Sequence, residues 1–331
     1  MGGRIGEVRD GMRLSRREVL AGALAAGAGL TLGMTPGAHA AGAAQAAAAD
    51  VPTRWPLITK RIPSTGERLP AIGLGTDKFR DSERAAIHAE IARMHQLGGT
   101  VIDTSADYGE SEALVGETLA TLQLRAAMFV ATKLVAGGAG FLGVDIGGRP
   151  SFERSLRRLQ TRRVDLLQVH NLEGVETLLP LMQQWKQQGQ IRYIGITTSE
   201  VDQHAQMVDY MHRYPLDFVQ VDYSLANRSA AADVLPLALQ QRIAVLINVP
   251  FGYGEVIRQA ESRPLPPWAA DIDVTSWGQF LLKYVISHPA VTCAIPGSTQ
   301  TAHLVDNQAA ARGRLPDEVM RRRMERYWDE G

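Results

Sequence analysis

Cysteine is almost absent from this chain of 331 residues, since Cys293 is the only one. A single cysteine excludes an internal disulfide and any zinc site built from cysteines. Charge of one sign is not in excess either: 35 basic residues balance 35 acidic ones, which disfavours nucleic acid or an anionic membrane as a partner. The 8 histidines lack the spacing of metal ligands, so we expect no metal site. These absences leave a small molecule as the expected partner.

Long apolar runs are missing as well, and the best candidate lies near the N-terminus. Val19–Met34 is rich in alanine, glycine and leucine, but it is shorter than the roughly 20 residues that span a bilayer. Ser15-Arg16-Arg17-Glu18-Val19-Leu20 resembles a twin-arginine export signal, and Ala38-His39-Ala40 offers a cleavage site. We therefore expect residues 1–40 to be a signal peptide for the twin-arginine export machinery. The mature chain would be periplasmic or extracellular, without stable membrane insertion.

The rest of the chain has two parts. Residues 41–57 begin with an alanine-rich stretch that predicts a flexible linker, and residues 58–331 predict one domain. In this domain short β-branched runs alternate with longer amphipathic stretches, which predicts an α/β fold, a single (β/α)8 TIM barrel. The eight expected strands are Ala71–Gly75, Thr100–Asp103, Met128–Lys133, Val164–Val169, Arg192–Ile196, Phe218–Asp222, Ile243–Asn248 and Val291–Ile295.

Two elements are expected outside the repeated units. Lys60–Leu69, with Ser64-Thr65-Gly66 at its centre, predicts an N-terminal β-hairpin, and Pro316–Trp328 predicts a C-terminal extra helix. Within the first unit, Asp81 or Ser82 is expected to cap the helix, and Gly98-Gly99 to end it.

Polar residues stand where several expected strands end. Asp103 ends the second strand, Lys133 ends the third, and His170 follows the fourth. Tyr108 comes five residues after Asp103, in a loop that can bend back over the same rim. Because chemistry in such barrels gathers at the C-terminal ends of the strands, we expect these four side chains to meet there.

Together these groups suit the transfer of a hydride to a carbonyl, which leaves an oxygen that needs a proton. Tyr108 can donate that proton, and the Lys133 ammonium would bring the pKa of Tyr108 closer to neutral. Asp103 would keep Lys133 charged against desolvation. His170 can donate a hydrogen bond to the substrate oxygen and orient it.

The chain closely resembles the aldo-keto reductase family over these and other motifs. Those motifs are Gly73-Leu74-Gly75-Thr76, Asp103-Thr104-Ser105, Tyr108-Gly109-Glu110-Ser111-Glu112, Thr132-Lys133, Gln168-Val169-His170, Gln220-Val221-Asp222-Tyr223 and Ile295-Pro296-Gly297-Ser298. The resemblance implies a catalytic tetrad of Asp103, Tyr108, Lys133 and His170. It also implies NADPH as cofactor and an aldehyde or ketone as substrate.

The resemblance further implies the cofactor contacts. Thr197-Thr198 and Gln220 would bind the nicotinamide amide, and Tyr223 would lie under the nicotinamide ring. At the adenosine end the implied residues are Gly297, Ser298, His303 and Asn307. The Lys and Arg that the family often uses to bind the 2′-phosphate are missing here, so NADP is expected while NAD stays possible.

Two alternatives stay open. Gly138-Ala139-Gly140-Phe141-Leu142-Gly143 fits a dinucleotide-binding fingerprint, but Gly147-Gly148-Arg149-Pro150 interrupts the helix that should follow it. We therefore interpret this segment as a glycine-rich active-site loop rather than a Rossmann turn. The second alternative is a barrel that binds the cofactor but serves as a regulatory or partner-binding subunit with little turnover.

Overall fold

The computed structural model describes residues 55–135 and 148–330. The expected signal peptide 1–40, most of the linker 41–57 and the glycine-rich segment Gly138–Gly143 lie outside the described residues. All described residues belong to one compact unit, Ala47–Gly331. Among them, no helix combines the length and the apolar character needed to cross a membrane.

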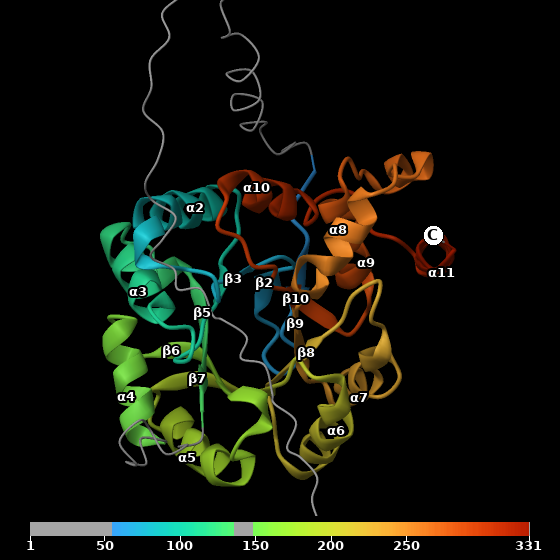
Figure 1. The fold of residues 1–331 in the computed structure, drawn as a ribbon. Coiled ribbons are helices and arrows are strands. Elements are labelled where there is room, and N and C mark those ends of the chain that lie inside the picture. Colours follow the sequence, from blue (N-terminus) through green and yellow to red (C-terminus); the bar gives the residue numbers. More distant parts are fainter. Residues whose placement is uncertain (1–54, 136–147, 331) are drawn as a thin grey trace, which may run out of the picture. The chain divides into compact units, whose positions relative to one another are not determined.

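Eight parallel strands form a single sheet in sequence order, as predicted (Figure 1). Parallel bridges from Ile72 to Ala294 and from Gly75 to Gly297 join the first strand to the last and close the barrel. The predicted limits of β6 and β8 are those observed, and the other strands differ by a few residues at their ends. The strands are β3 (Leu74–Gly75), β4 (Val101–Asp103), β5 (Phe129–Leu134), β6 (Val164–Val169), β7 (Ile191–Thr197), β8 (Phe218–Asp222), β9 (Ala244–Asn248) and β10 (Val291–Ala294).

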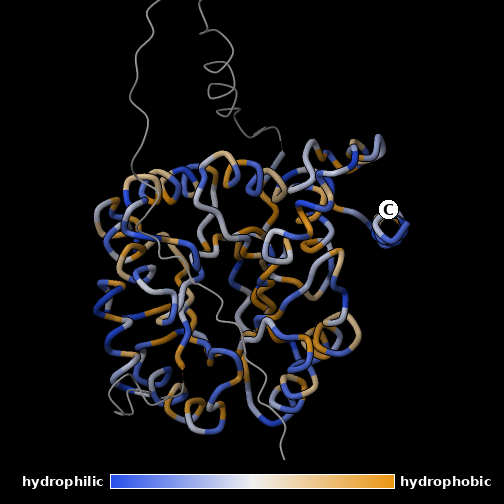
Figure 2. The backbone as a smooth tube through the Cα atoms, viewed as in Figure 1, coloured by the Kyte–Doolittle hydropathy of each residue, from blue (hydrophilic) through white to orange (hydrophobic). Residues whose placement is uncertain are grey.

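Helices surround this barrel (Figure 1). Along the tube in Figure 2, hydrophilic residues line the outward turns of the helices, and hydrophobic residues gather between the helices and the strands. The helices are α2 (Arg84–Gln96), α3 (Ser111–Thr121), α4 (Arg149–Arg158), α5 (Val175–Gln187), α6 (His204–Arg213), α7 (Val234–Gln241), α8 (Glu255–Glu261), α9 (Trp277–Ser287), α10 (Thr301–Ala309) and α11 (Glu318–Asp329).

The two-residue period of the strands produces two separate cores. Ile102 and Val130 face outward and pack under the helices in the larger cluster. Their neighbours Val101 and Phe129 face inward and fill the barrel in a smaller cluster. At the C-terminal ends of the strands, the inward-facing positions carry polar side chains instead.

The N-terminal hairpin closes the other end of the barrel. Its strands, β1 (Thr59–Arg61) and β2 (Arg68–Pro70), pair antiparallel. Ile62 and Leu69 from this hairpin belong to the inner cluster, so the hairpin is a plug for the barrel interior. The hairpin and α11 confirm the two elements predicted outside the repeats.

The predicted cap of the first helix was wrong. Asp81 and Ser82 lie inside a 3₁₀ turn, η2 (Asp81–Glu83), and α2 begins only at Arg84, without a side-chain cap. The Asp81 carboxylate instead forms an ion pair with Arg84. The helix ends just before Gly98-Gly99, as predicted. Gly98 has a φ of +90°, a conformation that favours glycine after a helix C-terminus.

Candidate active site

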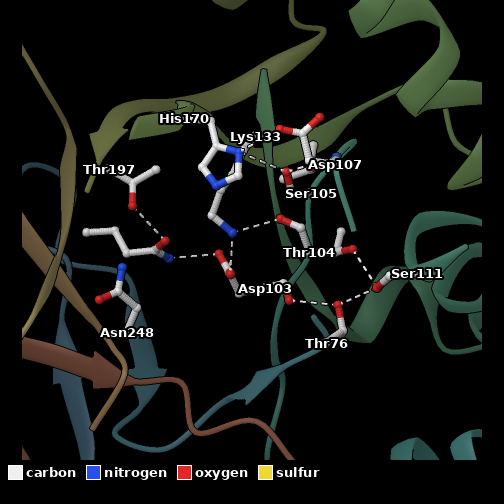
Figure 3. Close-up of polar contacts among 12 residues, drawn as sticks. Thr76, Asp103, Thr104, Ser105, Asp107, Ser111, Lys133, His170, Thr197 and Asn248 are labelled. Atoms are coloured by element: carbon white, nitrogen blue, oxygen red, sulfur yellow. Dashed lines mark hydrogen bonds and ion pairs between the residues drawn. The ribbon is translucent and has the colours of Figure 1, made fainter. Parts of the chain in front are cut away.

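Three inward-facing side chains from three strands form the floor of the site (Figure 3). Lys133 Nζ on β5 donates to Asp103 Oδ2 on β4 at 2.5 Å and to the Thr104 carbonyl oxygen at 2.9 Å. Gln220 Nε2 on β8 donates to the other carboxylate oxygen, Asp103 Oδ1, at 2.8 Å. Both oxygens of Asp103 are thus held by donors, which fixes the carboxylate between the lysine and the amide.

Burial and charge compete at Lys133, which is 1% exposed. Desolvation by burial alone would lower its pKa, but Asp103 and Tyr108 together raise the pKa above its ordinary value. Lys133 therefore carries its positive charge at neutral pH, as the sequence predicted.

Tyr108 lies in a loop between β4 and α3 whose ends are tied together. The Ser111 hydroxyl contacts Thr76 Oγ1 at 2.6 Å and Thr104 Oγ1 at 2.9 Å, and the backbone N–H of Ser111 donates to the Tyr108 carbonyl at 3.1 Å. This places the Tyr108 ring with its centroid 4.8 Å from Lys133 Nζ.

The pKa of Tyr108 differs from the expectation. Burial raises it, and Lys133 lowers it only in part, so the net shift is upward rather than toward neutral. Lys133 reduces the rise in the Tyr108 pKa that burial causes, but it does not reverse it. Tyr108 is therefore a fully protonated donor at neutral pH.

His170 approaches Tyr108 from the end of β6, which is separated from β4 by β5. It begins the short 3₁₀ turn η4 (His170–Leu172) that follows β6. Its ring lies edge-on to the Tyr108 ring, with centroids 5.9 Å apart and planes at 79°. Its Nδ1 lies 3.3 Å from both Ser105 Oγ and Asp107 Oδ2. The four residues expected to share one rim are brought together.

The polar residues expected to bind the nicotinamide amide form a connected row beside this group. Thr197 Oγ1 donates to Gln220 Oε1 at 2.9 Å. The Thr198 hydroxyl points instead into its own loop, where it donates to the Gln203 side chain and accepts from the Glu200 N–H. Thr197 and Gln220 thus belong to the site, whereas the Thr198 hydroxyl shapes the loop.

Asn248 was missed by the sequence argument. It ends β9, pairs in register with Asp222 and donates from Nδ2 to the Thr198 carbonyl at 3.1 Å. Its Oδ1 is buried without a hydrogen-bond partner in the described part of the chain. The strand-end position that selected Asp103 and Lys133 is the signal that could have found it.

Tyr223 follows β8 and is among the lining residues of the cavity between the loops after β7, β8 and β9. In β8, Gln220 faces inward and Val221 belongs to the outer cluster, and Tyr223 follows on the same outward register. Its hydroxyl donates to the Tyr284 hydroxyl at 3.1 Å and accepts from Arg321 at 2.7 Å. Tyr223 therefore links the barrel to α9 and α11.

The residues expected at the adenosine end lie around the start of α10. Gly297 is exposed opposite Gly75, and His303 is exposed in the first helical turn. Ser298 and Asn307 are buried. Backbone N–H groups at this helix start can bind a phosphate, but no Lys or Arg stands at these four positions.

A cavity of about 560 Å³ lies between the loops that follow β7, β8 and β9, and no residue of the tetrad lines it. Glu200, Asn227 and Tyr253 are among its lining residues. Its volume is in the range of small-molecule sites. Within residues 55–135 and 148–330, no cluster of side chains has the composition of a metal site.

Comparisons with known proteins agree with this geometry. The model of the aldo/keto reductase family matches residues 71–326. Methylglyoxal reductase YeaE of Escherichia coli is 31% identical over 265 residues, which cover 76% of this chain and 88% of the relative. L-Galactose dehydrogenase of Arabidopsis thaliana is 28% identical over 281 residues, covering 76% and 87%.

Solved structures match as well. An aldo-keto reductase from Klebsiella pneumoniae in complex with NADPH has 27% identity and a TM-score of 0.66, and the match covers 82% of this chain and 95% of that one. The holo form of a Bacillus halodurans aldo-keto reductase has a TM-score of 0.69 at 21% identity, which supports the fold. The chain therefore belongs to the aldo/keto reductase family of NAD(P)H-dependent oxidoreductases, which act on carbonyl groups.

Proposed function

We propose that this protein reduces an aldehyde or ketone to an alcohol, with Tyr108 as the general acid. The observation that carries the proposal is the contact of the Tyr108 ring with a buried, charged lysine, whose Nζ is 4.8 Å from the ring centroid. A cation at this place stabilises the phenolate that proton donation leaves behind.

The residues divide the chemistry between them. A nicotinamide cofactor held by Thr197, Gln220 and the start of α10 would supply the hydride to the carbonyl carbon. As the C=O π electrons move onto the oxygen, the Tyr108 O–H bond breaks and its proton goes to that oxygen. His170 donates a hydrogen bond to the same oxygen, and Asp103 keeps Lys133 in place and charged.

The polar groups at the barrel mouth fit a nicotinamide. Thr197 and Gln220 present fixed hydroxyl and amide groups, and Asn248 has a buried Oδ1 that lacks a partner among the described residues. A carboxamide can satisfy such an acceptor. The N-terminus of α10, with Gly297 and Ser298 before it, favours a phosphate at the other end.

We propose NADPH as the cofactor, with NADH as a second possibility. The Klebsiella relative was solved with NADPH, which supports the phosphorylated form. The absence of Lys and Arg at Gly297 and His303 leaves the 2′-phosphate without a charge-assisted pair, which keeps NADH in competition. Small carbonyl compounds are the substrate class that the names of the relatives support.

We also propose that the protein is exported through the twin-arginine route. The arginine pair Arg16-Arg17, the short apolar run and Ala38-His39-Ala40 support this proposal. Because this route takes folded proteins, the cofactor would travel inside the barrel.

The test is the absorbance of reduced nicotinamide, with NADPH or NADH and a series of small aldehydes and ketones. We expect carbonyl-dependent oxidation by the wild type and a loss of kcat of at least about 100-fold in Tyr108→Phe. Tyr214→Phe, a tyrosine remote from the site, is the matched control and should keep full activity. Cofactor binding without turnover of any carbonyl would contradict the proposal and favour a partner-binding barrel.

A further inference from the structure

Asp107 is a charged residue of the Tyr108 loop that stands outside the tetrad. Its Oδ2 lies 3.3 Å from His170 Nδ1, and its side chain is 53% exposed, against 13% for His170. Ser105 Oγ lies 3.3 Å from the same nitrogen and accepts from the Asp107 backbone N–H, also at 3.3 Å. Nδ1 of His170 therefore faces a carboxylate and a hydroxyl on the same edge of the ring (Figure 3).

These two neighbours differ in what they require of His170. A neutral imidazole has one N–H donor and one lone pair. The Ser105 hydroxyl can donate or accept, so it fits either tautomer. The Asp107 carboxylate can only accept, and a lone pair on Nδ1 would face its negative charge. The proton of neutral His170 thus belongs on Nδ1.

The other nitrogen, Nε2, is then left with the lone pair. Tyr108 lies edge-on to the ring and contacts Lys133, which pairs with Asp103. Among the described residues no hydrogen-bond acceptor contacts Nε2, so no contact favours the other tautomer. A lone pair on Nε2 cannot donate to a carbonyl oxygen.

We propose that Asp107 is a positioning residue that holds neutral His170 in the Nδ1–H tautomer, so that His170 donates to the substrate oxygen only as the imidazolium. This inference rests on the proposed carbonyl reduction. His170 then contributes a positive charge as well as a hydrogen bond to the oxygen that gains electrons.

The pH profile of kcat/KM for carbonyl reduction tests the catalytic consequence. In the wild type we expect kcat/KM to fall with rising pH by about tenfold per unit, the slope expected where one protonated group is required. In Asp107→Ala the Nε2–H tautomer becomes available, so the fall should stop at a plateau within about tenfold of the maximum. Glu173→Gln, which removes an exposed carboxylate three residues after His170, should follow the wild type. An Asp107→Ala profile that matches the wild type overturns the inference.

A spectroscopic measurement tests the tautomer without turnover. In the full chain with ¹⁵N-labelled histidine, the signals of His170 are assigned by their loss in His170→Gln. We expect Nδ1 protonated and Nε2 unprotonated in the neutral wild-type ring, with a shift toward Nε2–H in Asp107→Ala. Nε2–H in the wild type overturns the inference and leaves the reductase proposal intact. Nδ1–H in a protein that reduces no carbonyl supports the tautomer assignment but contradicts the proposed function.

Discussion

Lys133 is a charged side chain in a place where burial alone would neutralise it. Its ammonium is retained because Asp103 and Tyr108 raise its pKa by more than desolvation lowers it. Since this pKa lies above the ordinary value of 10.5, the contribution of the pairing to stability is fully present at neutral pH and is lost on the alkaline side as the pH rises through the higher, folded value. The ion pair therefore contributes to stability and catalysis throughout the neutral range.

Replacing Lys133 by methionine keeps the volume but leaves Asp103 buried without its cation. Breaking a buried pair in this way costs about 3–5 kcal/mol, so we expect a loss of that size in the free energy of unfolding from urea titrations. Activity should fall with it, because Tyr108 loses the cation that stabilises its phenolate.

The double variant Lys133→Met with Asp103→Asn separates these two effects. With both charges gone, we expect most of the stability to return while activity stays low. A Lys133→Met single variant within about 1 kcal/mol of the wild type would contradict an ionised, buried Asp103.

At this scale the sequence predicted the tetrad but not every neighbour. Asp103 and Lys133 follow from strand ends and the two-residue period, which fixes the face that a side chain takes. For Tyr223 the sequence predicted a place under the nicotinamide ring but not the bonds of its hydroxyl to Tyr284 and Arg321, which depend on helices far along the chain. The contact of Asp107 with His170 depends on the folded shape of a loop, which no periodicity encodes.

At the scale of elements, buried strands were predicted more sharply than helix starts. The runs that became β6 and β8 consist mostly of apolar residues, and the polar residues Arg163 and Asp217 precede them, so the pattern marks where each strand begins. The start of α2 was predicted less well, because Asp81 lies in a 3₁₀ turn and not at the helix N-cap. Its carboxylate forms an ion pair with Arg84 and caps no backbone N–H of the helix.

Asp273 and Arg314 tie the end of the 3₁₀ turn η8 (Pro267–Ile272) to the segment between α10 and α11. The Arg314 guanidinium and backbone N–H donate to both Asp273 oxygens at 2.9–3.0 Å. Lys283 reinforces the same junction, because its Nζ donates to three backbone carbonyls at 2.7–2.8 Å. Hydrogen bonds from Arg314 lower the pKa of Asp273 to about 2.

This depressed pKa predicts an acid-dependent contribution to stability. The contribution is present above the ordinary value of 3.8 and is lost as the pH falls through about 2. Because Arg314 is exposed to solvent, we expect Asp273→Asn to cost only about 1 kcal/mol at pH 6. The difference from the wild type, measured by urea unfolding, should shrink between pH 4 and pH 2. Asp271→Asn, an exposed carboxylate in the same turn, should show no such trend, and a pH-independent difference for Asp273→Asn would contradict the ion pair.

At the scale of the whole molecule, the catalytic barrel contains all the structural parts that the proposed reaction needs. The tetrad, the amide row and the start of α10 lie within the unit Ala47–Gly331. The sequence could assign these two parts of the chain different tasks because they differ in composition, one as a leader and the other as repeated βα units. It could not reveal whether the leader acts.

Replacing Arg16 and Arg17 by lysine tests the leader apart from the barrel. The substitution keeps the positive charge but removes the arginine pair that the export machinery is expected to read, so the protein should stay in the cytoplasm, as cell fractionation would show. Its melting temperature and carbonyl reductase activity should match those of the wild type, because the barrel is unchanged. A lysine variant that reaches the periplasm as well as the wild type does would refute the twin-arginine proposal. The control is Tyr108→Phe in the same fractionation experiment. This inactive but folded barrel should still be exported.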